Sequence, residues 1–199
     1  MVQKLNYLKE TASQTAGPYV HIGLAPGDAG FDIYRQELGR DIAGPNAKGE
    51  RITVEGTVID GTGAPVKDVL IEIWQANAAG RYVGRGEVED GFRGWGRVIP
   101  DFESGKWKFE TVKPGAVMGR TNRMMAPHLN LWLVARGINL GLNTRMYFSD
   151  EESANAADPV LNLIEQAHRR DTLIAKKEGS TYRFDIHLQG EGETVFLDI

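Results

Sequence analysis

Short segments in which hydrophobic and polar residues alternate recur along most of this 199-residue chain, and they constrain its fold more than any other feature. In residues 51–60, for example, Ile52, Val54 and Val58 fall on the same side of an extended backbone, because strand side chains alternate with period two. Sequences rich in Gly, Pro and Asp separate these segments and are typical of turns. We therefore expect strands within residues 51–60, 67–76, 96–100, 106–112, 128–137, 138–148, 172–178, 181–189 and 193–199.

Many short strands with little helix predict a mainly β fold, a β-sandwich of antiparallel strands. Residues 1–50 are turn-rich and predict an irregular N-terminal arm, with some helical character only in residues 31–40. A few short helices complete this picture. The clearest is expected over residues 158–171, where Asp158 can cap the first turn and Pro159 suits the first helical position. The length fits a single domain over residues 1–199.

Composition excludes several classes of protein. The formal net charge of −4 argues against a nucleic-acid partner, whose electrostatic footprint is a basic patch. No run approaches the roughly 18 apolar residues that indicate a membrane span, and the first residues lack the apolar stretch of a signal peptide. Cysteine is absent, so disulfides, thiolate metal sites and cysteine nucleophiles are excluded. We expect a cytoplasmic protein.

The most suggestive chemical pattern is the pair His128 and Asn130. Two residues apart on a strand, their side chains should point the same way. A second histidine at this spacing would indicate a metal site, but an amide binds transition metals poorly. Glu165 and His168 resemble half of a di-iron motif, which needs further carboxylates from neighbouring helices that this β-rich chain lacks. The residues alone thus indicate no self-contained active site.

Longer motifs resemble a known family. The stretch VEGTVIDGTGAPVKDVLIEIWQANAAGRY (54–82) is similar to the signature of the intradiol ring-cleavage dioxygenases. TVKPGAV (111–117) and APHLNLWLVARG (126–137) continue the same order of motifs. SQTAGPYVHIG (13–23) and QGEGETVFLDI (189–199) narrow the resemblance to one member of the family. The resemblance covers nearly the whole chain.

The family holds a non-haem Fe(III) with two tyrosines and two histidines. By position, Tyr82 matches the first tyrosine and His128 the first histidine. Val117 stands at the second tyrosine and Asn130 at the second histidine. Valine can neither ligate the metal nor neutralise its charge. The resemblance therefore implies a vestigial metal site, in which Tyr82 and His128 are now structural and hydrogen-bonded within the fold.

The member that fits best is built from two homologous chains, α and β, in an (αβ)n oligomer. The resemblance implies that this chain is α, that Fe(3+) is bound by the partner β subunit, and that α lines part of the pocket for a small aromatic substrate. The implied substrate-binding residues are Arg136, Thr15 and the turn of Gly17, Pro18 and Tyr19.

The position of Arg136 agrees with such a role. It shares strand parity with His128, and eight extended residues place it about 26 Å away. It is therefore poorly placed to serve its own chain's vestigial site, whereas its guanidinium offers a fixed fork of donors to a substrate carboxylate.

Two alternative functions of the whole chain stay open. One is a non-catalytic binding or scaffold protein on the same fold; the other is a lone dioxygenase that uses Tyr82, His128 and a carboxylate.

Overall fold

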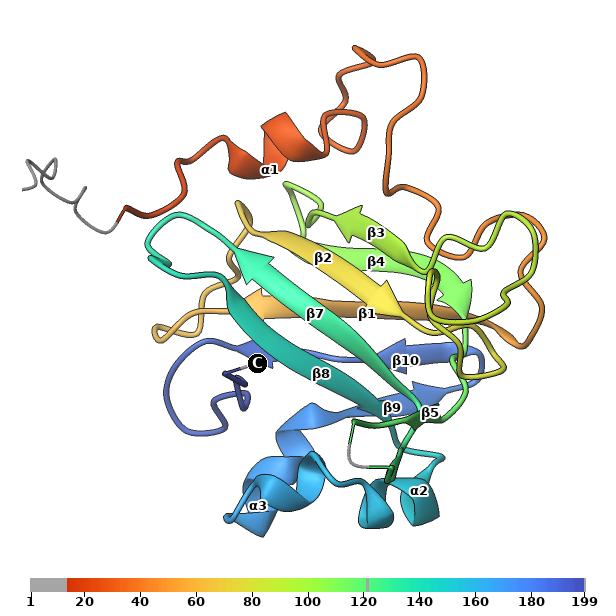
Figure 1. The fold of residues 1–199 in the computed structure, drawn as a ribbon. Helices are drawn as coiled ribbons and strands as arrows, with labels where there is room; N and C mark the ends of the chain where they lie inside the picture. The colour runs from red at the N-terminus through yellow and green to blue at the C-terminus, as the bar shows by residue number, and fades with distance from the viewer. Residues whose placement is uncertain (1–13, 121, 199) are drawn as a thin grey trace, which may run out of the picture.

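The computed structural model describes residues 14–120 and 122–198, and its framework is a strongly curved sheet (Figure 1). Neighbouring strands follow the order β11-β1-β10-β9-β8-β7-β2-β3, and β4 pairs with β1. A small hairpin, β5-β6, stands apart from this sheet. The strands are β1 (Arg51–Ile59), β2 (Leu70–Gln75), β3 (Trp95–Val98), β4 (Lys106–Val112), β5 (Val117–Met118), β6 (Met124–Met125), β7 (His128–Val134), β8 (Leu142–Phe148), β9 (Ile174–Glu178), β10 (Thr181–Arg183) and β11 (Ile186–His187).

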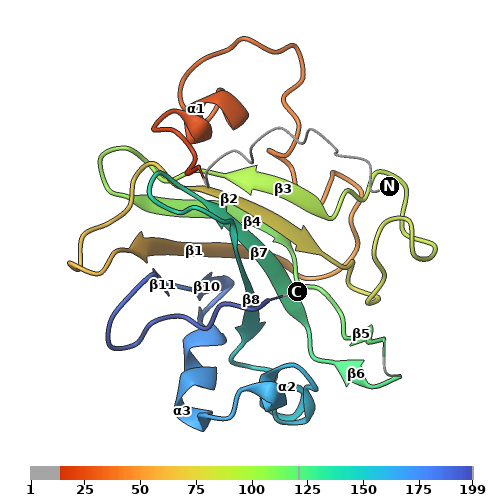
Figure 2. The ribbon, with the colours of Figure 1, turned by 60° about the vertical axis from the view of Figure 1, so that its left-hand side comes forward.

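The sheet folds back so that β2, β7 and β8 lie over β1, β4 and β10 (Figures 1 and 2). One core fills the space between these layers. Ile73 and Leu131 enter it from the first layer, Val54 and Trp107 from the second, and each is at most 2% exposed. This arrangement confirms the expected mainly β sandwich. The pairings β1–β10, β1–β11 and β8–β9 are parallel, however, so the sheet is mixed and not purely antiparallel.

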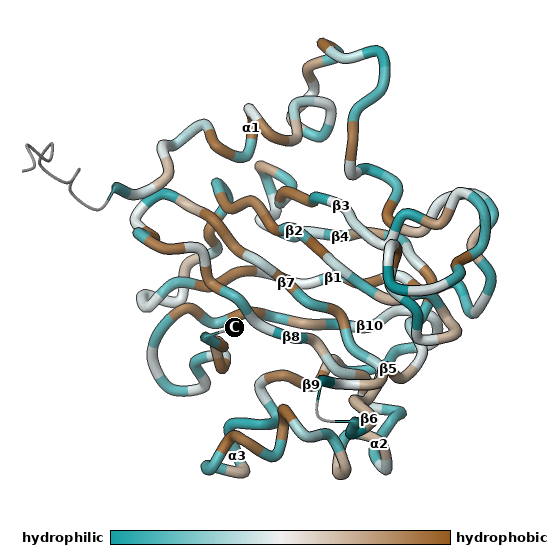
Figure 3. Tube along the Cα trace, viewed as in Figure 1, coloured by the Kyte–Doolittle hydropathy of each residue, from teal (hydrophilic) through white to brown (hydrophobic). Residues whose placement is uncertain are grey.

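Alternation along the strands explains why this core forms. Every second residue of β1 from Ile52 to Val58 is buried, as its sequence pattern predicts. Figure 3 shows hydrophobic and hydrophilic residues alternating along the central strands. At Gly56 of β1, a Cβ atom would collide with the carbonyl group of Phe184. Only glycine therefore allows the C-terminal strands to approach β1 so closely.

The helices are shorter than the sequence suggested. They are α1 (Val20–Leu24), α2 (Glu152–Ala157), η1 (Leu161–Leu163), α3 (Ala167–Arg170) and η2 (Asp171–Leu173). The expected single helix over residues 158–171 is wrong, because Ile164 and Gln166 have extended backbones that interrupt it. The Arg170 side chain donates to the carbonyl oxygen of Ile164 at 2.9 and 3.0 Å, which satisfies this group without a helix. Residues 31–40 form no helix either.

Several strand boundaries also differ, and the expected strand over residues 181–189 is divided into β10 and β11. Strand β7 ends at Val134, residues 138–141 are not part of β8, and Arg136 lies in the turn after β7. The argument from strand parity for Arg136 is therefore wrong, although it and His128 do lie at opposite ends of β7. Residues 193–198 run beside β8 and β11 without forming a strand. A side chain takes the place of a backbone group in this pairing, since the Thr194 hydroxyl accepts from the His187 amide.

The described part of the N-terminal region, residues 14–50, is irregular apart from α1, and it runs along the β3 edge of the sheet (Figure 1). Ile42 anchors it in the main core, and Ala25 packs with Leu70 and Ile99. Residues 1–13 of the expected arm lie outside the described residues. No helix among the described residues is long and apolar enough to cross a membrane.

Candidate functional site

Adjacent strands bring the predicted vestigial residues into one row on the outer face of the sheet. Asn130 of β7 is paired with Trp74 of β2 on one side and with Arg145 of β8 on the other. One step along the same face, His128 is paired with Tyr147. Directly opposed side chains in an antiparallel pair lie close enough to interact. The two-residue spacing predicted that His128 and Asn130 share this face, and the register of β8 adds Tyr147 and Arg145 to the row.

A glycine-dependent loop brings Tyr82 to this row. Gly80 has a φ of +73°, and a Cβ atom there would collide with the carbonyl group of Ala116. At Gly115, a Cβ would likewise collide with the carbonyl group of Ala78. The two loops can pack this closely only because both positions are glycine. Tyr82 then lies against Trp74, with ring centroids 6.3 Å apart and nearly parallel.

Hydrogen bonds link Tyr82, His128 and Asn130 in a fixed order. His128 Nδ1 lies 2.7 Å from the carbonyl oxygen of Ala126 and must donate to it, which leaves Nε2 as an acceptor. The Tyr82 hydroxyl, 3.3 Å from Nε2, donates there. Asn130 Nδ2 donates to the Tyr82 oxygen at 2.9 Å, and Arg145 Nε donates to Asn130 Oδ1 at 3.1 Å. Each polar side-chain atom of Tyr82, His128 and Asn130 therefore has a hydrogen-bond partner.

The other side of the row completes a ring. The Arg145 guanidinium donates to the Tyr147 hydroxyl at 3.4 Å, and this hydroxyl donates to Asp158 at 3.2 Å. The second carboxylate oxygen of Asp158 accepts from the Ala126 amide at 2.8 Å, close to where His128 donates. Asp158 is fully buried and also accepts from the amides of residues 160 and 161. Asp158 thus holds the turn that leads into η1, whereas the long helix that it was expected to cap does not form.

Burial and charge fix the protonation states. Burial lowers the pKa of His128 to about 4, and the nearby Arg145 charge adds to the effect. Burial raises the pKa of Tyr82 above its ordinary value of 10, although the hydrogen bond from Asn130 and the Arg145 charge partly offset this. At neutral pH the pair is therefore a neutral imidazole and a neutral phenol. These states match the hydrogen bond between them.

Val117, the remaining vestigial position, lies in the β5-β6 hairpin opposite Met125. The sulfur of Met125 lies 3.4 Å from the guanidinium of Arg145, so the hairpin closes over the same cluster. Val117 itself is 9% exposed and carries no donor atom. The structure thus links all four predicted vestigial positions to Arg145, directly through Asn130 and indirectly for the rest, although no sequence motif singles out Arg145.

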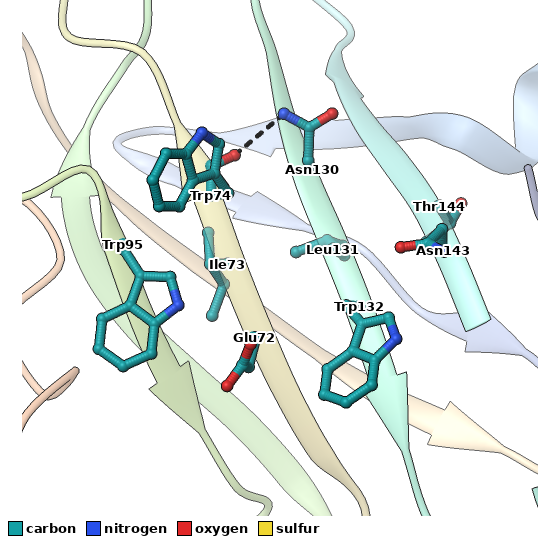
Figure 4. A pocket seen from close by; sticks show the side chains of 9 residues that line it. All are labelled: Glu72, Ile73, Trp74, Trp95, Asn130, Leu131, Trp132, Asn143 and Thr144. Carbon is teal, nitrogen blue, oxygen red and sulfur yellow. Dashed lines mark hydrogen bonds between the residues drawn. The ribbon is translucent and has the colours of Figure 1, made fainter. Parts of the chain in front are cut away.

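Beyond this cluster the sheet surface is open and aromatic. Trp74, Trp95 and Trp132, here called the tryptophan face, surround a hollow of about 360 Å³ (Figure 4). Trp74 is 44% and Trp132 36% exposed. Glu72 lies between them in the same view and pairs with Arg97 at 2.7 Å. Asn130 borders the hollow and donates to the Trp74 carbonyl oxygen at 3.2 Å, so the vestigial cluster opens onto this face.

Two of the predicted substrate-binding residues, Thr15 and Arg136, lie together at the other end of β7. The Thr15 hydroxyl accepts from the Gly137 amide at 2.6 Å and donates to the Ala135 carbonyl oxygen at 3.3 Å. Thr15 and Arg136, 121 positions apart in sequence, are thereby neighbours. The Arg136 side chain is 65% exposed and lies 3.3 Å from Asp68.

Gly17, Pro18 and Tyr19 form the turn that leads into α1, and they are exposed as well. Tyr19 is 74% exposed, an unusual state for a tyrosine that serves only packing. The two predicted groups of residues are thus separate, one buried at the start of β7 and the other open beyond its end.

Comparisons with known proteins agree with this geometry. A family model described as dioxygenase matches residues 30–190. The chain is 53% identical, over 98% of both chains, to the protocatechuate 3,4-dioxygenase alpha chain of Pseudomonas putida. The chain belongs to the intradiol ring-cleaving dioxygenases. It is also 38% identical to the protocatechuate 3,4-dioxygenase beta chain of Burkholderia cepacia, over 73% of this chain and 67% of that one.

Solved structures share the fold. The hydroxyquinol 1,2-dioxygenase of Pseudomonas putida DLL-E4 superposes with a TM-score of 0.56 at 17% identity, covering 85% of this chain and 72% of that one. Catechol 1,2-dioxygenase from Acinetobacter sp. ADP1 gives the same TM-score at 19% identity, over 80% and 60%. Such distant likeness concerns the fold alone.

Intradiol dioxygenases are iron enzymes, so the donor set of the vestigial cluster was tested against ferric iron. Of the four positions that match the family's ligands, only Tyr82 and His128 could ligate it, and their ligand atoms are already hydrogen-bonded to each other. Tyr147 and Asp158 are also engaged, the first with Arg145 and the second with backbone amides. Val117 offers nothing, Asn130 offers an amide, and Arg145 adds a positive charge. Within residues 14–120 and 122–198, no three His, Cys, Asp or Glu side chains gather as a metal site would require. The residues present do not fit ferric iron.

Arg145, Tyr147 and Asp158 are the cluster residues that sequence reasoning missed. The strand register that places Arg145 beside Asn130 depends on the length of the 135–141 turn, which the sequence pattern did not define. Asp158 was recognised as a cap, but its contact with the Ala126 amide spans 32 residues and carries no local signal.

Proposed function

We propose that this chain is the α-type subunit of a protocatechuate 3,4-dioxygenase, assembled with a homologous β subunit into an (αβ)n oligomer in the cytoplasm. The two relatives support this, since the chain resembles an α chain over nearly its full length and a β chain over most of it. The tryptophan face is a suitable contact surface, because exposed aromatic patches mark protein interfaces.

The reaction of such a complex joins protocatechuate and O₂ and opens the ring between its two hydroxyls, giving 3-carboxy-cis,cis-muconate. Fe(3+), if held by the β subunit, would supply the activation of the aromatic ring toward O₂. The part of this chain is to complete the pocket. Positioning of this kind accelerates a reaction by holding the substrate in the reactive geometry.

Arg136 would bind the substrate carboxylate, while Thr15 and the turn of Gly17, Pro18 and Tyr19 would shape the pocket around it. The observation that carries the proposal is the separation of the two groups along β7. The open group contains a guanidinium and an exposed tyrosine but no iron ligand, whereas the group with remnants of iron ligands is closed by hydrogen bonds. Residues left exposed in the isolated chain are what a site shared with a partner requires.

The test is to express this chain alone, a homologous β chain alone, and both together, and then to measure oxygen consumption with protocatechuate. We expect the two chains to co-purify, with activity and iron in the joint preparation and no activity in this chain alone. Iron-dependent cleavage by this chain alone would favour a lone dioxygenase. Failure of the pair to associate would favour a binding or scaffold protein.

A further inference from the structure

Arg145 has surroundings that are unusual for a half-buried arginine. Its guanidinium is contacted by three neutral electron-rich atoms, which are Asn130 Oδ1, the Tyr147 hydroxyl oxygen and the sulfur of Met125. Among the described residues, no carboxylate lies within ion-pair distance of it. Partly buried charges are usually paired. Asp158 reaches Arg145 only through the Tyr147 hydroxyl, so the atoms in direct contact with the guanidinium are dipoles and a soft sulfur atom, as around a bound cation.

The remnants of the iron ligands belong to the same surroundings. Asn130 contacts Arg145 directly, and Met125 is the strand partner of Val117. Tyr82 and His128 follow through the hydrogen bonds of Asn130. The positions that would surround an iron ion in the family are therefore linked to a guanidinium here, Asn130 by direct contact and the other three through Asn130 or Met125.

The orientation of the donors keeps this arrangement closed. Both Nδ2 hydrogens of Asn130 are used, on Tyr82 and on the Trp74 carbonyl, so its oxygen must face Arg145. The Tyr82 hydroxyl keeps its proton and donates it in a hydrogen bond to the unprotonated Nε2 of His128. Metal binding would have to remove the Tyr82 proton and break the hydrogen bonds of Tyr82 with His128 and Asn130. It would also place a second positive charge beside the guanidinium.

We propose that Arg145 is a built-in replacement for the metal ion, which supplies the positive charge of the site and keeps iron out of this chain. Loss of two ligands is then only part of the reason that the cluster does not fit iron. The inference concerns this chain's own cluster and holds with or without a β partner.

The test restores the ligands with and without the cation. The Val117→Tyr/Asn130→His variant regains both missing ligand types and retains Arg145. Adding Arg145→Gln removes the charge but leaves a polar side chain of moderate length. Adding Arg145→Lys to the same pair is the matched control, since it keeps the charge and changes the shape. The first measurement is the iron content per copy of this chain, taken as the difference from wild type so that iron bound by any partner cancels. The second is the visible absorbance of tyrosinate bound to Fe(III).

We expect the double variant and its Arg145→Lys derivative to gain no iron, and the Arg145→Gln derivative to gain about one iron per chain and visible colour. Affinity for Fe(III) should differ at least 100-fold between the Gln and Lys derivatives. Stoichiometric iron in the double variant would overturn the proposal, and so would a folded Arg145→Gln derivative that gains none. If that derivative does not fold, the double variant still decides, because the proposal requires it to stay free of additional iron.

Discussion

Replacing Arg136 by alanine gives the sharpest test of the proposed substrate contact. Arg136 lies in the turn after β7, is 65% exposed, and has only Nε near Asp68, at 3.3 Å. The terminal nitrogens of its fork are therefore suited to a carboxylate from outside the chain. Loss of one charge-assisted hydrogen bond costs about 1.5–3 kcal/mol. We expect kcat/KM for protocatechuate to fall about 10- to 150-fold in the assembled enzyme.

The matched control is Arg183→Ala. Arg183 is 51% exposed and pairs through Nε with a single aspartate at 3.0 Å, much as Arg136 does, but it lies on β10. Steady-state kinetics should show no loss in this control, and catechol, which lacks the carboxylate, should be little affected by Arg136→Ala. Arg136→Lys should recover part of the loss, since it keeps the charge without the planar fork. Equal losses for protocatechuate and catechol, at unchanged iron content, would refute the role of Arg136 in carboxylate binding.

The remaining predictions concern assembly and stability. Produced without its partner, this chain should aggregate at micromolar concentration, because the tryptophan face would be exposed; a stable monomer in analytical ultracentrifugation would contradict this. Asp158→Ala should lower the free energy of unfolding by about 3 kcal/mol, because it leaves buried amides unpaired, whereas exposed Asp32→Ala should change it by less than about 0.5 kcal/mol in urea titrations. Burial raises the pKa of Asp150, but hydrogen bonds from Lys177 and Lys113 outweigh this and hold it well below 3.8. The stability advantage of wild type over Asp150→Asn should therefore be present above pH 3.8 and shrink as the pH falls below that value, and a constant advantage down to pH 2 would refute this.

The strands could largely be predicted from the sequence because their cause is local. Residues such as Ile52, Val54 and Val58 alternate with polar neighbours, and burial of one side follows from that alternation. The helix over residues 158–171 could not be excluded in this way. Its interruption depends on the Arg170 side chain reaching the Ile164 carbonyl and on Asp158 being drawn into the core, and both are tertiary contacts.

In the candidate site, too, features with a local cause could be predicted and features that depend on tertiary contacts could not. The common direction of His128 and Asn130 follows from strand periodicity, whereas the contact of Thr15 with the turn that carries Arg136 joins residues far apart in the sequence and has no local signal. Arg145 could not be found, because its importance depends on strand register across a turn. Because of its charge and the hydrogen bonds around it, the missing ligands are not the whole difference between this cluster and an iron site. The cluster has a new cation as well as fewer ligands.

The central claim is that iron chemistry takes place on a partner and that this chain completes the pocket. Anomalous diffraction at the iron absorption edge, on crystals of the assembled complex, tests this most directly. We predict an iron peak on the partner chain beside Tyr19 and Arg136 of this chain, and no peak within the cluster around Arg145. An iron peak between Tyr82 and His128 would contradict the account.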